Sequence, residues 1–177
     1  MAAPRAYADS PYNRSMQGDP KVIDHLNRVL KGEFTAIHQY IVHAEMCDNW
    51  GYSKLGAFIK LQAIGEMRHA EILIERILFL EGVPGMGELS PLNVGQNVHE
   101  QLGNDVQLEY EAVRILNVAI KDAVAAGDNA SRELFETILK DEEEHVDWLE
   151  AQLQMIDDMG LGIYLSQQLP DAAAPAG

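Results

Sequence analysis

The sequence is poor in cysteine and in basic residues. Cys47 is its single cysteine, so one chain can build neither a disulfide framework nor a cysteine-rich zinc or iron–sulfur site. Its 13 Lys and Arg stand against 28 Asp and Glu, which gives a formal net charge of −15. Because binding to phosphates needs clusters of Lys and Arg, this balance argues against nucleic-acid binding and favours cations as ligands.

Long hydrophobic runs are also absent. No segment reaches the roughly 20 uninterrupted apolar residues of a membrane span, and the first 18 residues hold no apolar run of signal-peptide length. We therefore predict a cytoplasmic protein with no membrane association. A chain of 177 residues corresponds to one domain. We expect this domain at residues 19–169, between a disordered N-terminal extension at 1–18 and a disordered tail at 170–177.

Helix-start and helix-stop signals predict four long helices. Asp19 and Pro20 form a good N-cap and first-residue pair, Ser53 can cap a second helix, and Asn97 with Glu100 matches a capping box. No strand pattern appears. The predicted helices run from residue 20 to about residue 48, from residue 53 to residue 81, from residue 97 to about residue 126, and from the AGDN turn to about residue 159, with a short fifth helix between residues 160 and 169.

The lengths of the connections predict the topology. Two short turns join the helices into two antiparallel hairpins, whereas the linker of residues 82–97 is 16 residues long and contains four Gly and two Pro. Such a linker can stretch to about 50 Å, and each long helix measures roughly 43 Å. The fold class predicted is all-α: a four-helix bundle with one long crossover and a short C-terminal helix.

Acidic residues interrupt the apolar stripe of every long helix. Each predicted hairpin carries a Glu followed, 33 residues later, by a Glu-x-x-His motif on the next helix. Four buried carboxylates without matching Lys or Arg on the stripes would be too costly as bare charges, whereas two divalent cations would balance them. Carboxylate and imidazole without thiolate suit iron or manganese. The six residues are Glu33, Glu66, His69, Glu109, Glu142 and His145.

Each part of this pattern has an ordinary alternative. One Glu-x-x-His motif is weak evidence in a chain of this composition, and Glu33 or Glu109 alone could equally be a salt-bridged residue. The combination on four helices favours a site for two metal ions.

Five stretches of sequence resemble the bacterioferritins, which belong to the ferritin-like di-iron carboxylate proteins. The similarity extends from about residue 21 to residue 169. It implies that the six residues are ferroxidase ligands, with Glu66 and Glu142 bridging the metals and Tyr40 and Trp148 close by. The stretches are GEFTAIHQYIVHAEM, GEMRHAE, ERILFLEGVP, LKDEEEHVDWLE and MGLGIYL.

The resemblance also implies a function, iron storage and detoxification. Two Fe(II) ions per subunit are oxidised by dioxygen or hydrogen peroxide, and the product is kept as a ferric mineral inside a homo-oligomeric shell of 24 subunits built from dimers. One haem per two subunits, ligated by Met67 from each, aids iron release, with a ferredoxin-type protein as candidate electron donor. The short fifth helix is expected at subunit junctions.

Two departures from the family pattern limit this interpretation. Where well-known bacterioferritins carry a His and an Asp for an inner-surface iron site, this chain has Leu61 and Gly65, and Leu73 replaces a Tyr of some members. A rival function also remains open. A ferritin-like di-iron oxidoreductase without storage, such as a rubrerythrin-like peroxidase, would use the same six residues, although the sequence contains no Cys-x-x-Cys electron-transfer module.

Overall fold

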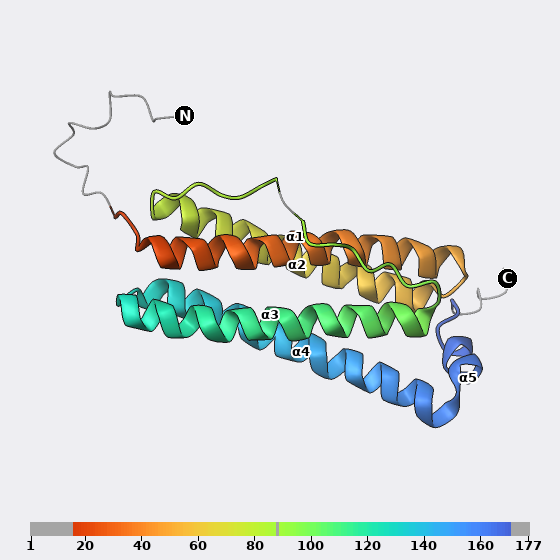
Figure 1. Cartoon of the computed structure of the whole chain (residues 1–177). Helices are drawn as coiled ribbons and strands as arrows, with labels where there is room; N and C mark the ends of the chain where they lie inside the picture. Colours follow the sequence, from red (N-terminus) through yellow and green to blue (C-terminus); the bar gives the residue numbers. More distant parts are fainter. Residues whose placement is uncertain (1–15, 88, 171–177) are drawn as a thin grey trace, which may run out of the picture.

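The computed structural model describes residues 16–87 and 89–170, which form five helices and contain no strand (Figure 1). The all-α prediction is confirmed. Most of the two segments predicted to be disordered, residues 1–15 and 171–177, lies outside the described residues. The helices are α1 (Pro20–Asn49), α2 (Ser53–Phe79), α3 (Val98–Ala126), α4 (Asn129–Met159) and α5 (Leu161–Ser166).

Two of the three predicted helix starts are confirmed. The Asp19 side chain accepts a hydrogen bond from the backbone of Lys21, with Pro20 as the first helical residue of α1. The Asn97 side chain likewise accepts from the backbone N–H of Glu100 at 3.0 Å. The prediction that Ser53 caps α2 is wrong: Ser53 is already the first residue of that helix, and no side chain caps it.

Helix α2 ends earlier than predicted. It stops at Phe79 rather than at residue 81, because Glu81 has a left-handed backbone (φ 61°) and Gly82 N–H turns back to the carbonyl of Ile77. Helix α5 lies within the predicted residues 160–169 and ends at Ser166. After it, the carbonyl of Gln168 accepts a hydrogen bond from Lys54 N–H, in the first turn of α2. This bond ties the end of the described chain to the bundle.

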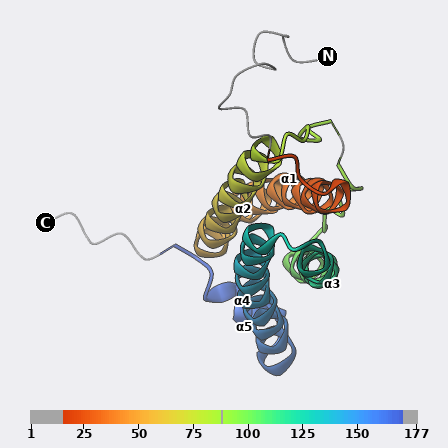
Figure 2. The same cartoon turned by 90° about the vertical axis from the view of Figure 1, so that its left-hand side faces the viewer.

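The long helices form two antiparallel hairpins, α1 with α2 and α3 with α4, and α5 lies at one end of the bundle (Figures 1 and 2). The linker between α2 and α3 runs the length of the bundle beside α1, which confirms the predicted crossover. Side chains of α1 four residues apart hold it there. Thr35 Oγ1, Gln39 Oε1 and His43 Nε2 accept from the backbone N–H groups of Ser90, Asn93 and Gly95 at 3.0–3.2 Å.

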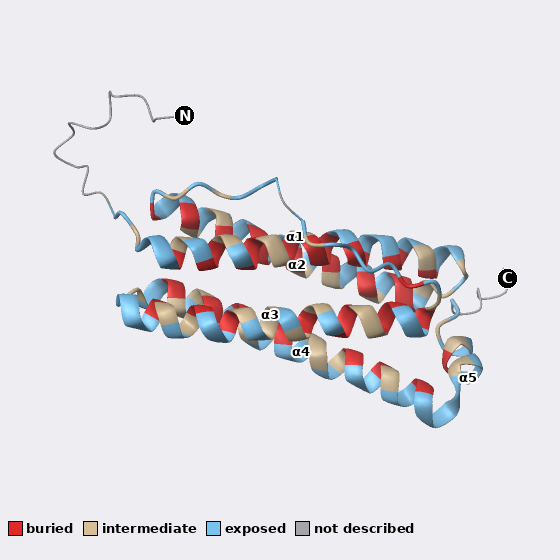
Figure 3. Cartoon of the chain, in the orientation of Figure 1, coloured by how far each residue is buried: buried red, intermediate tan, exposed pale blue. Residues whose placement is uncertain are grey.

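The buried residues follow the inner faces of the long helices (Figure 3). They form two apolar clusters, one toward each end of the bundle. On α2, Glu66 lies between Ile59 of one cluster and Leu73 of the other, so the polar residues occupy the middle of the bundle. None of the described helices combines the length and the apolar character needed to cross a membrane.

Candidate metal centre

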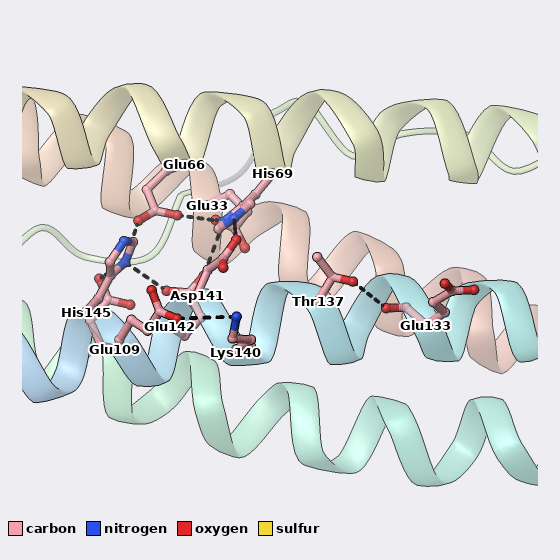
Figure 4. A network of polar contacts seen from close by, with 11 residues as sticks. Glu33, Glu66, His69, Glu109, Glu133, Thr137, Lys140, Asp141, Glu142 and His145 are labelled. Carbon is pink, nitrogen blue, oxygen red and sulfur yellow. Dashed lines mark hydrogen bonds and ion pairs between the residues drawn. The ribbon is translucent and has the colours of Figure 1, made fainter.

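The structure brings all six predicted residues together in the middle of the bundle (Figure 4). Helices α1 and α3 contribute one Glu each, and α2 and α4 contribute a Glu and a His each, one turn apart, so that both side chains of each motif face inward. The four carboxylates are at most 4% exposed. Such burial of four acids requires compensation by protons or cations.

The six residues divide into two overlapping groups. One contains Glu33 and His69, the other Glu109 and His145, and both contain Glu66 and Glu142. Within each group the potential ligand atoms all lie within 4.8 Å of one another. This is the geometry of two adjacent metal positions with two shared carboxylates.

Each histidine points its Nδ1 atom into one group. His69 Nδ1 lies 2.9 Å from Glu66 and 3.4 Å from Glu142. His145 Nδ1 lies 3.1 Å from Glu66 and 3.3 Å from Glu142. His145 Nδ1, Glu66 Oε1 and Glu142 Oε2 meet only in these ion-pair contacts, and none of the three atoms makes a hydrogen bond. Buried polar atoms left unsatisfied around one point fit a metal ion.

The carboxylates favour the protonated form of both histidines. Burial lowers the pKa of His145, but its contacts with Glu142 and Glu66 outweigh burial and raise the pKa to about 10. Burial also lowers the pKa of His69, but its contacts with Glu142 and Glu33 outweigh burial and raise that pKa. In return, burial raises the pKa of Glu142, but His145 and His69 lower it to about 2.

The pKa values of the two outer carboxyl groups, Glu33 and Glu109, shift in the opposite direction from that of Glu142. Burial raises the pKa of Glu33 and of Glu109 well above the ordinary value, and the charge of Glu142 raises both further. For Glu66, burial and Glu142 raise the pKa, but the two histidines lower it by more. In the metal-free centre these shifts favour the neutral acid for Glu33 and Glu109, the carboxylate for Glu66 and Glu142, and the imidazolium form for both histidines.

A cavity of about 230 Å³ connects the centre with the surface between α1 and α3. Ala36 and Ala112 line it, Glu109 lies at its inner end, and Arg28 and Glu111, both about half exposed, lie toward solvent. The cavity gives small molecules access to the shared carboxylates.

The aromatic residues expected near the centre differ in their contacts. Tyr40 O–H donates to Glu109 Oε1. Trp148 stacks on Phe58 at 4.0 Å between ring centroids and shares a small hollow with His145 and Tyr40.

Sequence reasoning missed a second group of buried polar residues, here called the α1–α3 polar cluster: Gln39, His43, Gln101 and Asp105. Asp105 accepts from Gln39 Nε2 at 2.8 Å and from His43 Nδ1 at about 3.0 Å. Because His43 Nε2 accepts from Gly95, Nδ1 is the donor. Spacing could have found the cluster, since residues 39 and 43, and 101 and 105, are each one helical turn apart.

Met67 lies on a different side of α2 from the six residues. Its side chain is 46% exposed and lines a shallow hollow of about 350 Å³ together with Phe34, Ile37, Ile74 and Met86. The residues that line the hollow are mainly apolar.

Other singled-out residues lie away from the centre. Leu61 is exposed on α2, and Leu73 is fully buried in the core. On α5, Tyr164 is buried and its O–H donates to Gln152 at 3.0 Å, whereas Ile163 is 59% exposed.

Comparison with known proteins places the chain in a family. Residues 23–159 match the model of the ferritin-like domain. The chain is 44% identical over 164 residues to a bacterioferritin of Streptomyces coelicolor, covering 90% of this chain and 98% of the relative. It is 42% identical over 152 residues to bacterioferritin BfrA of Mycobacterium tuberculosis, with 86% and 96% covered. A bacterioferritin of Rhodobacter capsulatus is 41% identical over 145 residues, with 82% and 90% covered. The chain therefore belongs to the bacterioferritin family.

Proposed function

We propose that the protein stores iron in the cytoplasm by oxidising Fe(II) at the buried centre and retaining the ferric product in a shell of 24 subunits built from dimers. The observation that carries the proposal is the pair of four-residue groups that share Glu66 and Glu142. Membership of the bacterioferritin family supports storage over a purely catalytic role.

The two groups define the metal positions. Glu33 and His69 serve one iron ion, Glu109 and His145 serve the other, and Glu66 with Glu142 bridges both. The unsatisfied atoms of the centre face these positions. Two divalent cations carry four positive charges, which balance the four carboxylates of the centre. Nitrogen and oxygen donors without thiolate suit Fe(II).

The centre's chemistry is the oxidation of paired substrate ions. Each Fe(II) gives up one electron, and the two electrons with two protons reduce hydrogen peroxide to two water molecules, or dioxygen to hydrogen peroxide. The protein contributes proximity, because the shared carboxylates keep both ions within reach of one oxidant molecule. The cavity between α1 and α3 provides the entry route.

Haem binding belongs to the same proposal. The apolar hollow and the half-exposed thioether of Met67 fit one haem shared by two subunits, with Met67 from each. When bound, haem passes electrons from a ferredoxin-type donor to stored ferric iron. A Met67→Leu variant should assemble and oxidise Fe(II) but lose the haem absorption band. Met86→Leu, in the same hollow, is the matched control, and full haem occupancy in Met67→Leu would assign the ligand elsewhere.

Aerobic titration with Fe(II) tests the oxidation. The parent should oxidise about two ions per chain in a fast phase and then accumulate a core. Glu66→Ala or Glu142→Ala should abolish the fast phase, whereas Glu144→Ala, whose side chain is 68% exposed on α4, should not. Parent-like oxidation by either bridging variant would refute the assignment.

Size-exclusion chromatography tests the storage role. A particle of about two dozen subunits supports storage, while a dimer with intact Fe(II) oxidation would favour the rubrerythrin-like oxidoreductase.

A further inference from the structure

The candidate metal centre is an imperfect repeat. Each hairpin supplies one outer Glu and, 33 residues later, a Glu-x-x-His motif, and the two halves meet at Glu66 and Glu142. The residue before Glu66 is Gly65, and the residue before Glu142 is Asp141. One half of the repeat therefore has a carboxylate where the other half has no side chain.

Asp141 contacts the histidine of the opposite motif. Its Oδ2 atom lies 3.2 Å from His69 Nε2, while His69 Nδ1 faces the shared carboxylates (Figure 4). A carboxylate behind an imidazole fixes the orientation of the ring, holds the proton on Nε2 and makes Nδ1 a better metal donor. Asp141 is thus placed to support His69 without touching the metal position itself.

His145 has no such support. Within residues 16–87 and 89–170, its recorded polar contacts are all made by Nδ1, with Glu66, Glu109 and Glu142. Gly65 is the position from which the repeat would supply a carboxylate. A Cβ atom built on Gly65 meets nothing within 4 Å, so the site has room for a side chain.

A second difference acts in the same direction. Tyr40 O–H donates to Glu109, in the His145 half, and this draws electron density away from one carboxylate ligand. By the repeat, the position equivalent to Tyr40 is seven residues after Glu109, where Leu116 offers no donor to Glu33. In the His69 half, the imidazole contacts a carboxylate and the outer Glu33 accepts no hydrogen bond from a residue equivalent to Tyr40.

We propose that Asp141 is a positioning residue that makes the two metal positions unequal, so that the His69 position binds a divalent cation first and more tightly than the His145 position. The inference rests on the proposed ligand assignment. Loss of such a supporting partner typically weakens metal binding about 10- to 100-fold. The first Fe(II) is therefore held at the His69 position until a second ion and an oxidant arrive.

Titration of the metal-free protein with Co(II), followed by its visible absorption, tests the order. The parent should bind two Co(II) per chain in two resolved steps. Glu33→Gln should remove the tight step and Glu109→Gln the weak one. Two binding steps of equal affinity in the parent would overturn only the proposed difference between the two positions. Absence of Co(II) binding at the centre would overturn the proposed metal site itself.

Two variants test the role of Asp141. Asp141→Asn should weaken the first step about 10- to 100-fold and leave the second step unchanged. Asp147→Asn, which makes the same charge change at an exposed position of α4, should alter neither step. Equal weakening of both steps, or an unchanged first step, in Asp141→Asn would overturn the proposal.

Gly65→Asp tests the same idea by addition. The new carboxylate should support His145 and tighten the second step toward the first, while the neutral Gly65→Asn should not. An unchanged affinity of the second step in Gly65→Asp would overturn the inference. A third bound Co(II) per chain would also overturn it, because the introduced carboxylate would then be acting as a metal ligand.

Discussion

Two groups of buried polar residues lie close together in this bundle, and they differ in whether their atoms satisfy one another. In the α1–α3 polar cluster, Gln39 and His43 donate to Asp105 and accept from the crossover, so no buried side-chain atom of these residues lacks a partner. In the metal centre, buried atoms of Glu66, Glu142 and His145 remain unsatisfied.

The difference separates a structural group from a binding site. Burial and charge are shared by both groups, so neither property identifies a metal site by itself. Three unsatisfied ligand atoms gathered in one group favour a metal site, because a complete hydrogen-bond network leaves no donor atoms for an added ion. A single unsatisfied atom, such as His25 Nδ1 or Arg132 Nε, does not. The cluster fastens the crossover to α1 and α3, whereas the atoms of the centre form two groups that could each hold a metal ion.

Breaking the cluster should have the largest effect on stability. Asp105→Ala leaves the donors of Gln39 and His43 buried without partners, each at a cost of about 1–3 kcal/mol. We expect the free energy of unfolding of the metal-free protein to fall by roughly 2–5 kcal/mol. Thermal unfolding followed by circular dichroism measures this loss. Asp147→Ala is the exposed control, and a variant as stable as the parent would show that the network is dispensable.

Proton release on metal binding should distinguish the metal centre from the α1–α3 polar cluster. Because metal ions must displace the protons on His69, His145, Glu33 and Glu109, binding of two ions near pH 6 should release up to about four protons per chain. The raised pKa of His145, about 10, means that this proton is still bound at neutral pH. Apparent metal affinity should therefore increase as pH rises. A pH indicator in weak buffer counts the protons, and release of none would contradict the protonated centre.

Replacing one outer carboxylate should have the smallest effect on stability. Burial raises the pKa of Glu33 well above its ordinary value, which favours the neutral acid in the metal-free protein, and Glu33→Gln copies the shape of that acid without a charge. The free energy of unfolding of the metal-free protein should change by no more than about 1 kcal/mol. A loss as large as that of Asp105→Ala would show that Glu33 is an ionised structural residue.

The sequence predicts most of the helices and the residues of the centre because both depend on local periodicity. Glu33 and Glu142 interrupt apolar stripes at steps of three and four, and such steps place residues on one helix face. Helix ends were predicted less well, since the end of α2 depends on the left-handed backbone of Glu81.

Contacts between helices could not be predicted in the same way. Asp141 directly precedes Glu142, so the helical period turns it about 100° away from the inward face. Its contact with His69 exists only because α2 and α4 pack side by side at this level. The pairing of Gln39 with Asp105 likewise depends on the register of α1 against α3.

Anomalous diffraction from crystals soaked in Fe(II) without oxygen tests directly whether two metal ions lie between the shared carboxylates. We expect two peaks per chain between Glu66 and Glu142, one beside Glu33 and His69 and the other beside Glu109 and His145. A single peak, or peaks only outside these six residues, would contradict this expectation.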